Sequence, residues 1–320
     1  MALTVGIMHS GTSGGPGRPD DNIQQFRDAL NATYNGAQQI QYHAPLFAKH
    51  NRGQLPIQAQ TLVGANVDVL VAAGGTASAE AAKNATQTIP IVFTSVTDPA
   101  QAVPNPPNNR NMTGVCARTS GLDADRLQIL HELYPQATKF GALFNSKRSN
   151  YPSQRPNLQG AAMALGLDPL VDQPPIDQDA PNIPNQIDQA FLAFRNAQCA
   201  AVLVTADPLF NDLRDIVVRT GPAPVAPLRD PPAIYQWGEF VEDENGLISY
   251  GPNLTVAYQL AGLQTARILE QLPLPLGGQI NYPPVLVLDN FELVINLKTA
   301  KRIQKDIPAT LLKRADKIIV

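Results

Sequence analysis

The sequence predicts an α/β protein made of two doubly wound halves, each with a parallel sheet covered by helices. The segment Val67–Ala73 is apolar without alternation, which is typical of a parallel strand buried on both faces, and it stops at Gly74-Gly75. An alanine-rich segment of good helical composition follows, and a second apolar strand is expected at Ile89–Phe93. These elements form one β-α-β unit, around which the first half is organised.

The other elements of the first half follow from the same patterns. An apolar strand at Leu3–Met8 precedes a helix that Asp20 or Asp21 caps. A second strand at Gln39–Tyr42 and a second helix at Leu55–Val63 lead into the β-α-β unit. The half ends in a proline- and asparagine-rich connector at 101–111.

The second half repeats the alternation of strands and helices. Between the connector and this repeat come a short strand at Thr113–Cys116 and a helix from Asp123. Strands are then expected at Phe140–Phe144, Pro169–Val171 and Ala200–Thr205, and helices around Leu158–Leu165 and through Ile187, Phe191 and Phe194. The last third is expected to begin with two short strands, at Ala233–Phe240 and Gly246–Pro252, around an acidic turn at 242–245. A long helix at Asn253–Leu272 follows, and then apolar segments at Val285–Leu288 and from Phe291.

Polar and aromatic side chains collect where the predicted strands end. Ligands of open parallel sheets bind beyond the carboxyl ends of the strands, so these residues are candidate ligand contacts. They are Ser10, Thr76, Ser78, Ser95, Thr97, Asn145, Asp207, Tyr235, Trp237 and Tyr250. The ordinary alternative for the hydroxyls is capping of helices and turns. Asp207 could instead simply cap a helix that starts near Asn211, and Trp237 could be a core residue between strands.

Composition and motifs exclude several classes of function. The net charge is −3, so no basic field indicates nucleic acid, and no apolar run is long enough to span a membrane. The two cysteines, Cys116 and Cys199, lack the spacing of a metal or redox site and are expected to be small buried residues. No catalytic motif and no cofactor motif is present, and the glycine-rich loop 11–19 lacks the spacing of a phosphate-binding loop.

Four motifs carry a resemblance to a known family: Ile89–Pro99, Gly246–Pro252, Phe291–Lys301 and Ile307–Asp316. The chain resembles ABC-transporter substrate-binding proteins with a type I periplasmic-binding fold, the group that includes tryptophan- and tyrosine-binding members. The resemblance covers nearly the whole chain. It implies two lobes joined by a three-strand hinge, with residues 1–117 and 251–288 in the first and 118–250 and 289–320 in the second. Two segments depart from the family pattern, namely the glycine-rich loop 11–19 and an apparent insertion at 221–232.

The resemblance and the residue chemistry together indicate binding rather than catalysis. We expect a receptor of an ABC importer that closes its lobes on a small metabolite and delivers it to the permease subunits. Hydroxyls and helix amino termini suit a carboxylate, Asp207 suits an ammonium group, and aromatic side chains suit an apolar body. An amino acid or a similar compound is therefore the expected ligand. The alternative is an enzyme on the same doubly wound scaffold that acts on a nucleotide or a sugar, because such folds host both functions.

The family also implies a location outside the inner membrane. No export signal precedes the strand at Leu3, so we expect the native reading frame to extend upstream of Met1 with a signal peptide or a lipoprotein cysteine. This expectation places the protein in the periplasm or an equivalent extracytoplasmic space.

Overall fold

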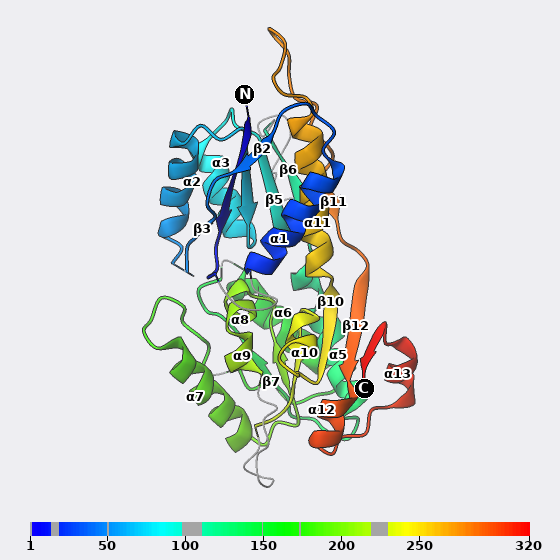
Figure 1. The fold of residues 1–320 in the computed structure, drawn as a ribbon. Helices are drawn as coiled ribbons and strands as arrows, with labels where there is room; N and C mark the ends of the chain where they lie inside the picture. Colours follow the sequence, from blue (N-terminus) through cyan, green and yellow to red (C-terminus); the bar gives the residue numbers. More distant parts are fainter. Residues whose placement is uncertain are drawn as a thin grey trace. The chain divides into compact units, whose positions relative to one another are not determined.

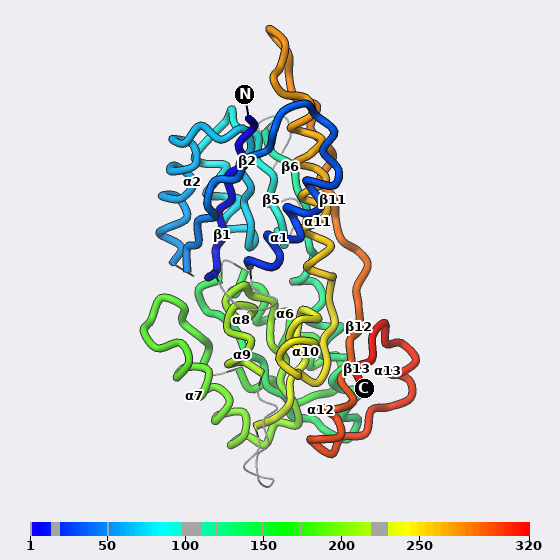
Figure 2. The backbone as a smooth tube through the Cα atoms, viewed as in Figure 1, coloured from blue at the N-terminus to red at the C-terminus, as the bar shows by residue number. Residues whose placement is uncertain are grey.

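The computed structural model describes residues 2–13, 19–49, 51–97, 111–148, 150–172, 174–218 and 230–320. The chain divides into two compact units (Figures 1 and 2). The first unit comprises Met1–Arg118 and Leu254–Asp289, and the second comprises Thr119–Asn253 and Asn290–Val320. The chain therefore passes between the units after Arg118, Asn253 and Asp289, whereas the sequence placed these crossings after residues 117, 250 and 288.

The first unit is built on a seven-stranded parallel sheet. Its strands, in spatial order, are β11 (Leu286–Val287), β6 (Met112–Cys116), β5 (Ile91–Val96), β4 (Val69–Ala73), β1 (Leu3–His9) and β2 (Ile40–Tyr42), with β3 (Leu46–Phe47) also paired to β1. Every residue of β4 is buried, as the apolar run predicted for a strand covered on both faces.

Helices cover both faces of this sheet. Helices α2 (Gln54–Gly64) and α3 (Thr76–Ala85) pack together on one face, and α1 (Pro19–Thr33) and α11 (Leu254–Leu269) pack together on the other (Figure 1). Gly262 of α11 lets the second pair approach closely, because a Cβ atom there would lie 2.4 Å from the carbonyl oxygen of Phe26. The first unit is thus doubly wound, and α11 shows that the segment after residue 254 completes it.

The second unit is built on a six-stranded sheet in which four neighbouring strands are parallel. These strands are β7 (Gly141–Leu143), β8 (Val202–Val204), β9 (Ala233–Tyr235) and β10 (Ile248–Pro252). Strand β12 (Phe291–Asn296) is antiparallel to β10, and β13 (Lys317–Ile319) runs parallel to β12. The carboxyl end of β12 therefore lies at the amino-terminal edge of the four parallel strands.

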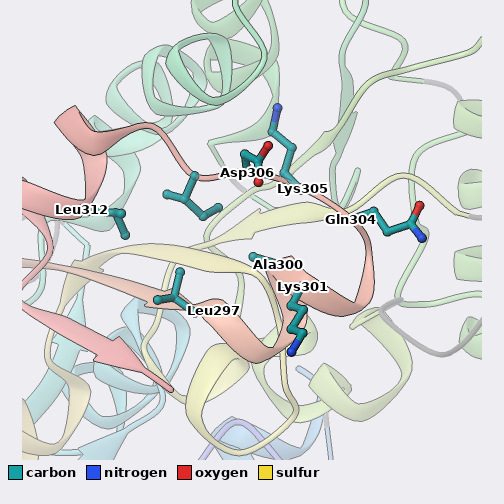
Figure 3. Close-up of a pocket in the computed structure, with 8 residues that line it drawn as sticks. Leu297, Ala300, Lys301, Gln304, Lys305, Asp306 and Leu312 are labelled. Atoms are coloured by element: carbon teal, nitrogen blue, oxygen red, sulfur yellow. The ribbon is translucent and has the colours of Figure 1, made fainter.

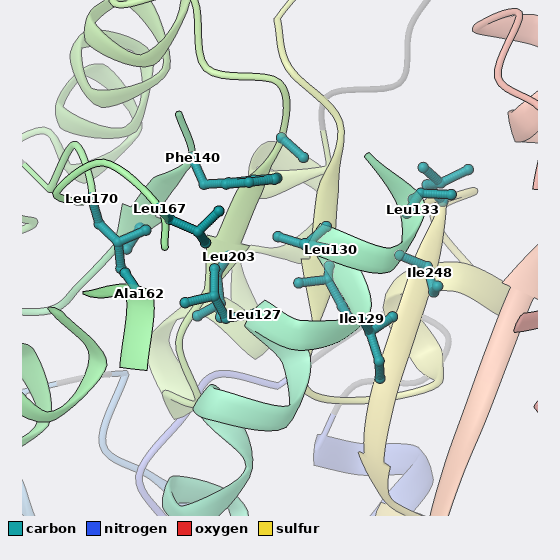
Figure 4. Packing of buried hydrophobic residues seen from close by; sticks show 14 of the residues in the cluster. Leu127, Ile129, Leu130, Leu133, Phe140, Ala162, Leu167, Leu170, Leu203 and Ile248 are labelled. Carbon is teal, nitrogen blue, oxygen red and sulfur yellow. The ribbon is translucent and has the colours of Figure 1, made fainter. Parts of the chain in front are cut away.

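The helices of the second unit connect these strands. They are α5 (Asp123–Leu133), α6 (Tyr151–Ala164), α7 (Ile183–Asn196), α8 (Pro208–Asp212), α9 (Arg214–Val217), α10 (Glu239–Glu242), α12 (Leu297–Arg302) and α13 (Ala309–Arg314), with a 3₁₀ turn at Thr119–Leu122 before α5. Figure 4 shows the core of this unit, where Leu127 and Leu130 of α5 pack with Leu203 of β8 and Ile248 of β10. Truncating a leucine buried in such a core costs roughly 2–5 kcal/mol.

Two sequence expectations in the second unit are wrong. The segment Pro169–Val171 is not a strand, because only Val171 makes an isolated bridge, to Gly141. The strand expected at Ala233–Phe240 ends at Tyr235, and α10 follows in place of a simple acidic turn. The reason is the parallel pairing of β9 with β10, since parallel strands need a crossover that a tight turn cannot supply.

Candidate functional site

The strand ends of the first unit are organised around His9 and Gly74. His9 Nδ1 accepts a hydrogen bond from the Gly11 amide at 2.8 Å, so in the neutral ring the proton is on Nε2, which lies 2.9 Å from the Tyr258 hydroxyl. The Ser10 hydroxyl donates to the Gly74 carbonyl oxygen at 2.7 Å. Gly74 has φ +84°, and a Cβ atom there would lie 2.3 Å from Ser10 Oγ. Only glycine fits this close approach of the ends of β1 and β4.

Three of the predicted hydroxyls lie at or near the start of α3 or at the end of β5. Thr76 is the first residue of α3, and Ser78 lies in the first turn. Ser78 is fully buried, and within the described part of the chain its hydroxyl has no hydrogen-bond partner. Ser95 has φ +61° at a register shift between β5 and β6, and its hydroxyl lies 3.0 Å from that of Thr94. A non-glycine residue held in this conformation is typical of a bulge that re-aims a side chain.

Thr97 directly follows β5 and is buried. Because β1, β4 and β5 are parallel neighbours, Ser10, Thr76 and Thr97 follow strand ends at one edge of the first sheet. Ser95 lies at the same edge, within the last two residues of β5. The sequence prediction that these ends gather polar side chains at one edge agrees with this topology. Whether any of them contacts a ligand stays a prediction.

The strand ends of the second unit carry a connected set of buried polar groups. Asn145 is 2% exposed and Asp207 is 3% exposed, and the Asn145 amide donates to Asp207 Oδ2 at 3.1 Å. The same amide donates to Gln178 Oε1 at 2.6 Å. Arg148 Nε lies 3.3 Å from Asp207 Oδ2, so the carboxylate is paired with a guanidinium. The two residues predicted separately from the ends of β7 and β8 thus lie in direct contact.

Asp207 also caps a helix, as the alternative interpretation of the sequence expected. Its Oδ1 accepts a hydrogen bond from the Leu209 amide at 2.8 Å at the start of α8. A carboxylate offers about four acceptor positions. Among the described residues, the Leu209 and Asn145 amides donate hydrogen bonds to the Asp207 carboxylate, and Arg148 forms an ion pair with it. The carboxylate therefore has acceptor capacity left for a further donor.

The three predicted aromatic residues lie on or after β9 and β10 in different surroundings. Tyr235 is fully buried and stacks on Phe240, with ring centroids 4.8 Å apart. Trp237 follows the end of β9 and is 7% exposed. Tyr250 is half-buried and contacts the Phe291 ring edge to face, and burial raises the pKa of its hydroxyl above the usual value. Tyr235 is therefore a core residue. Trp237 is slightly less buried than Tyr235, and Tyr250 is only half-buried.

Sequence reasoning missed several buried polar residues near these strand ends. Arg126 is fully buried, donates to the Tyr250 carbonyl oxygen at 2.7 Å and pairs with Asp123 at 2.6 Å. Burial raises the pKa of the Asp123 carboxyl, and the guanidinium of Arg126 opposes this shift. Gln236 is fully buried, and neither atom of its amide finds a partner among the described residues. Buried polar groups without partners are rare in proteins.

The sequence around these buried polar residues gave little indication that they lie near the strand ends. Arg148 directly follows the polar end of β7, in the run Asn145-Ser-Lys-Arg148, and this position could have indicated a charge at the strand end. Gln236 and Arg126 sit in apolar or amphipathic segments where only the three-dimensional contacts reveal their burial.

The described residues hold no metal-binding cluster and no helix capable of crossing a membrane. No group of three or more histidine, cysteine or acidic side chains is placed to hold a metal ion in the described ranges. In the same ranges, no helix combines the length and the apolar character that a membrane span requires. Cys116 and Cys199 are both buried and do not form a disulfide.

Comparison with solved structures identifies the fold. The chain aligns over 98% of its length with the whole of the ABC domain solved in complex with L-Trp from Streptococcus pneumoniae, with a TM-score of 0.74 and 20% identity. A 5-methylthioribose transporter solute binding protein from Thermotoga lettingae aligns over 97% of this chain and 91% of its own, with a TM-score of 0.60 and 10% identity. The fold is therefore the two-unit type I fold of periplasmic binding proteins, as predicted.

Sequence comparison then finds similarity to the same family over part of the chain. Residues 16–170 match the family model described as ABC transporter substrate binding protein. A tyrosine-binding protein of Clostridioides difficile is 25% identical over 236 residues, which are 72% of this chain and 62% of that protein's length. These matches agree with the family that the sequence motifs resembled, the substrate-binding proteins of ABC transporters.

Proposed function

We propose that this protein is the solute receptor of an ABC importer and that it captures an α-amino acid, or a compound like one, with an apolar or aromatic body. The receptor works outside the inner membrane, delivers its ligand to permease subunits and performs no catalysis. Its ligand is held by residues of both units, which close on it. The family match supports the receptor role, and the ligand class rests on the polar groups at the strand ends.

The observation that carries this proposal is the carboxylate of Asp207, buried at the end of β8, which keeps acceptor capacity beyond the two hydrogen bonds that the described residues donate to it. A ligand ammonium group supplies the missing donor, and its positive charge suits a carboxylate removed from water. Neighbouring Arg148 and Asn145 fix the orientation of the carboxylate before the ligand arrives. The body of the ligand would contact the ring of half-buried Tyr250 and that of Trp237, which is 7% exposed.

The first unit supplies the groups that suit the ligand carboxylate. Ser78 has a buried hydroxyl whose donor is unused among the described residues, and it lies in the first turn of α3. The amino terminus of a helix favours negative charge, because its amides are unsatisfied and the helix dipole is positive there. Thr76 and Ser95 add hydroxyls at the same edge of the sheet.

Two measurements test this function. Mass spectrometry of the small molecules released when the purified protein is denatured identifies what the receptor carries. Calorimetry of the stripped protein with amino acids, nucleosides and small sugars then ranks the classes. Recovery of the added ligand chemically unchanged is expected of a receptor. Conversion of the ligand would instead support the enzyme that the sequence left open.

A further inference from the structure

The second unit contains a hollow far from the strand ends that carry the proposed ligand site. It has a volume of about 530 Å³ and is formed by α12, the segment after it and α13 (Figure 3). Because α12 follows the carboxyl end of antiparallel β12, the hollow lies at the amino-terminal edge of β7–β10. Asn145 and Asp207 follow the opposite ends of these strands. The hollow is therefore separate from the groups proposed to bind the transported solute.

The lining of the hollow combines an apolar floor with charges at the rim. The apolar side chains are Leu297, Ala300, Ile307 and Leu312, and all four belong to or pack against the core of the second unit. The charged side chains are Lys301, Lys305 and Asp306, which give the rim one more positive than negative charge. With Gln304, half of the lining residues are polar or charged. The volume lies within the range of roughly 300–1,000 Å³ that small-molecule sites in proteins have.

The two lysines differ in what they contact. The Lys305 ammonium lies over the Tyr134 ring, 4.1 Å from its centroid, and is held there by a cation–π contact. The Lys301 ammonium is exposed and makes no hydrogen bond or ion pair with any residue that the structure describes. Figure 3 shows the two side chains extending in opposite directions. Of the two lysines that line the hollow among the described residues, Lys301 is thus the one that remains available to a ligand.

The surrounding segment is also positive, although the whole chain carries a net charge of −3. Between residues 298 and 317 the basic side chains are Lys298, Lys301, Arg302, Lys305, Lys313, Arg314 and Lys317, and the acidic ones are Asp306 and Asp316. Arg314 and Lys317 are paired with Glu132 and Glu242. The remaining excess of positive charge attracts anions towards the hollow.

We propose that this hollow is a second binding site, for a small monoanion with an apolar body such as a medium-chain or aromatic carboxylate. The apolar body lies on the floor formed by Leu297, Ile307 and Leu312, and the carboxylate pairs with Lys301. No ammonium group is required, which distinguishes this ligand from the amino acid proposed for the strand-end site. The site goes beyond the proposed transport function and does not depend on it.

The test is a titration of the isotope-labelled full chain with octanoate, followed by amide NMR shifts. Octylammonium serves as the matched probe, because it has the same apolar body and the opposite charge. We expect octanoate to shift the amides of residues 297–312 saturably and octylammonium to bind there at least tenfold more weakly. Equal binding of the two probes, or octanoate shifts confined to the residues around Asp207, would overturn the proposal.

Two exposed lysines of α12 supply matched variants. Lys301 lines the hollow and Lys298 does not, so Lys301→Glu should weaken octanoate binding about tenfold, and Lys298→Glu should change it less than about threefold. Neither lysine is buried, so both variants are expected to fold. An equal loss of octanoate affinity in the two variants would show that binding depends only on the net positive charge of the segment. The assigned site would then be wrong.

Discussion

The Asn145 amide donates a hydrogen bond to the Asp207 carboxylate at 3.1 Å, and this contact joins the ends of two neighbouring parallel strands, β7 and β8. Arg148 completes the group from the loop after β7. The arrangement holds a carboxylate out of water, with two hydrogen bonds and an ion pair from the described residues that fix its orientation. Such a preorganised carboxylate costs little to reorient when a cation binds.

The first prediction concerns the charge of Asp207. Asp207→Asn keeps an oxygen that can accept the Leu209 amide, so helix α8 remains capped, but Arg148 loses its ion pair and the free energy of unfolding should fall by roughly 1–3 kcal/mol. The ligand ammonium loses its charged partner and meets an unpaired Arg148. Since a hydrogen bond to a charged group contributes roughly 1.5–3 kcal/mol, calorimetry should show affinity weakened about tenfold to a hundredfold.

Asp172→Asn is the control for this variant. Asp172 is a buried carboxylate of the same unit, paired with Arg155 at 2.6 Å, and it does not belong to the strand-end group. Its loss should leave ligand affinity unchanged. If both variants bind the amino acid as tightly as the wild type, Asp207 has no role in binding.

The second prediction separates binding from stability at Ser78. Its buried hydroxyl forms no hydrogen bond with the described residues, so Ser78→Ala removes an unsatisfied group and should stabilise the protein by about 1 kcal/mol. The same change removes a donor to the ligand carboxylate and should weaken binding about tenfold or more. Chemical denaturation and calorimetry measure the two effects. A variant that loses stability and keeps its affinity would contradict the assigned role.

The third prediction concerns the backbone at Gly74. Gly74→Ala places a Cβ atom 2.3 Å from Ser10 Oγ at φ +84°, so it should destabilise the first unit by roughly 1–3 kcal/mol and weaken ligand binding. Gly166→Ala is the matched control, because Gly166 has φ +72° and no atom within 4 Å of the added Cβ. It should show the cost of the backbone conformation alone, with affinity unchanged. Equal loss of affinity in both would point to a general effect of reduced stability.

The fourth prediction is a pH dependence from Glu239. Burial raises the pKa of this carboxyl from its ordinary value of 4.5 to about 7, and Arg214 opposes the shift. Between these values the folded protein keeps a proton that the unfolded chain has released. The stabilisation is therefore present below pH 4.5 and is lost as the pH rises to 7, at up to about 1.4 kcal/mol per pH unit.

Glu239→Gln cannot ionise, so its advantage over the wild type should grow as the pH rises. Urea denaturation of both proteins at pH 5 and at pH 8 measures this difference. A constant difference at the two pH values would mean that Glu239 titrates normally in the folded protein.

The parts of the fold that the sequence predicted are those set by local pattern. The unalternating apolar run became β4, and the alanine-rich segment after Gly75 became α3, because burial on both faces and helical composition act within a few residues. The strand end at Tyr235 was missed, since Trp237 and Phe240 read as a continuation of a β segment. Only the parallel pairing of β9 and β10 requires a crossover there.

The same distinction applies to the candidate site. Asn145 and Asp207 were predicted because each follows an apolar strand, and parallel pairing of those strands brings them together. Arg148 and Gln236 were not predicted, because their burial and their partners depend on contacts distant in sequence. Local patterns therefore located the edge of the sheet but not the full set of charges on it.

The central claim is tested most directly by calorimetry of the ligand-stripped full chain against the twenty amino acids, nucleosides and small sugars. The account predicts saturable one-to-one binding of an apolar or aromatic amino acid, at least tenfold tighter than any nucleoside or sugar. Tight binding of a sugar or a nucleoside, with no amino acid bound, would contradict the ligand class and the ammonium role of Asp207.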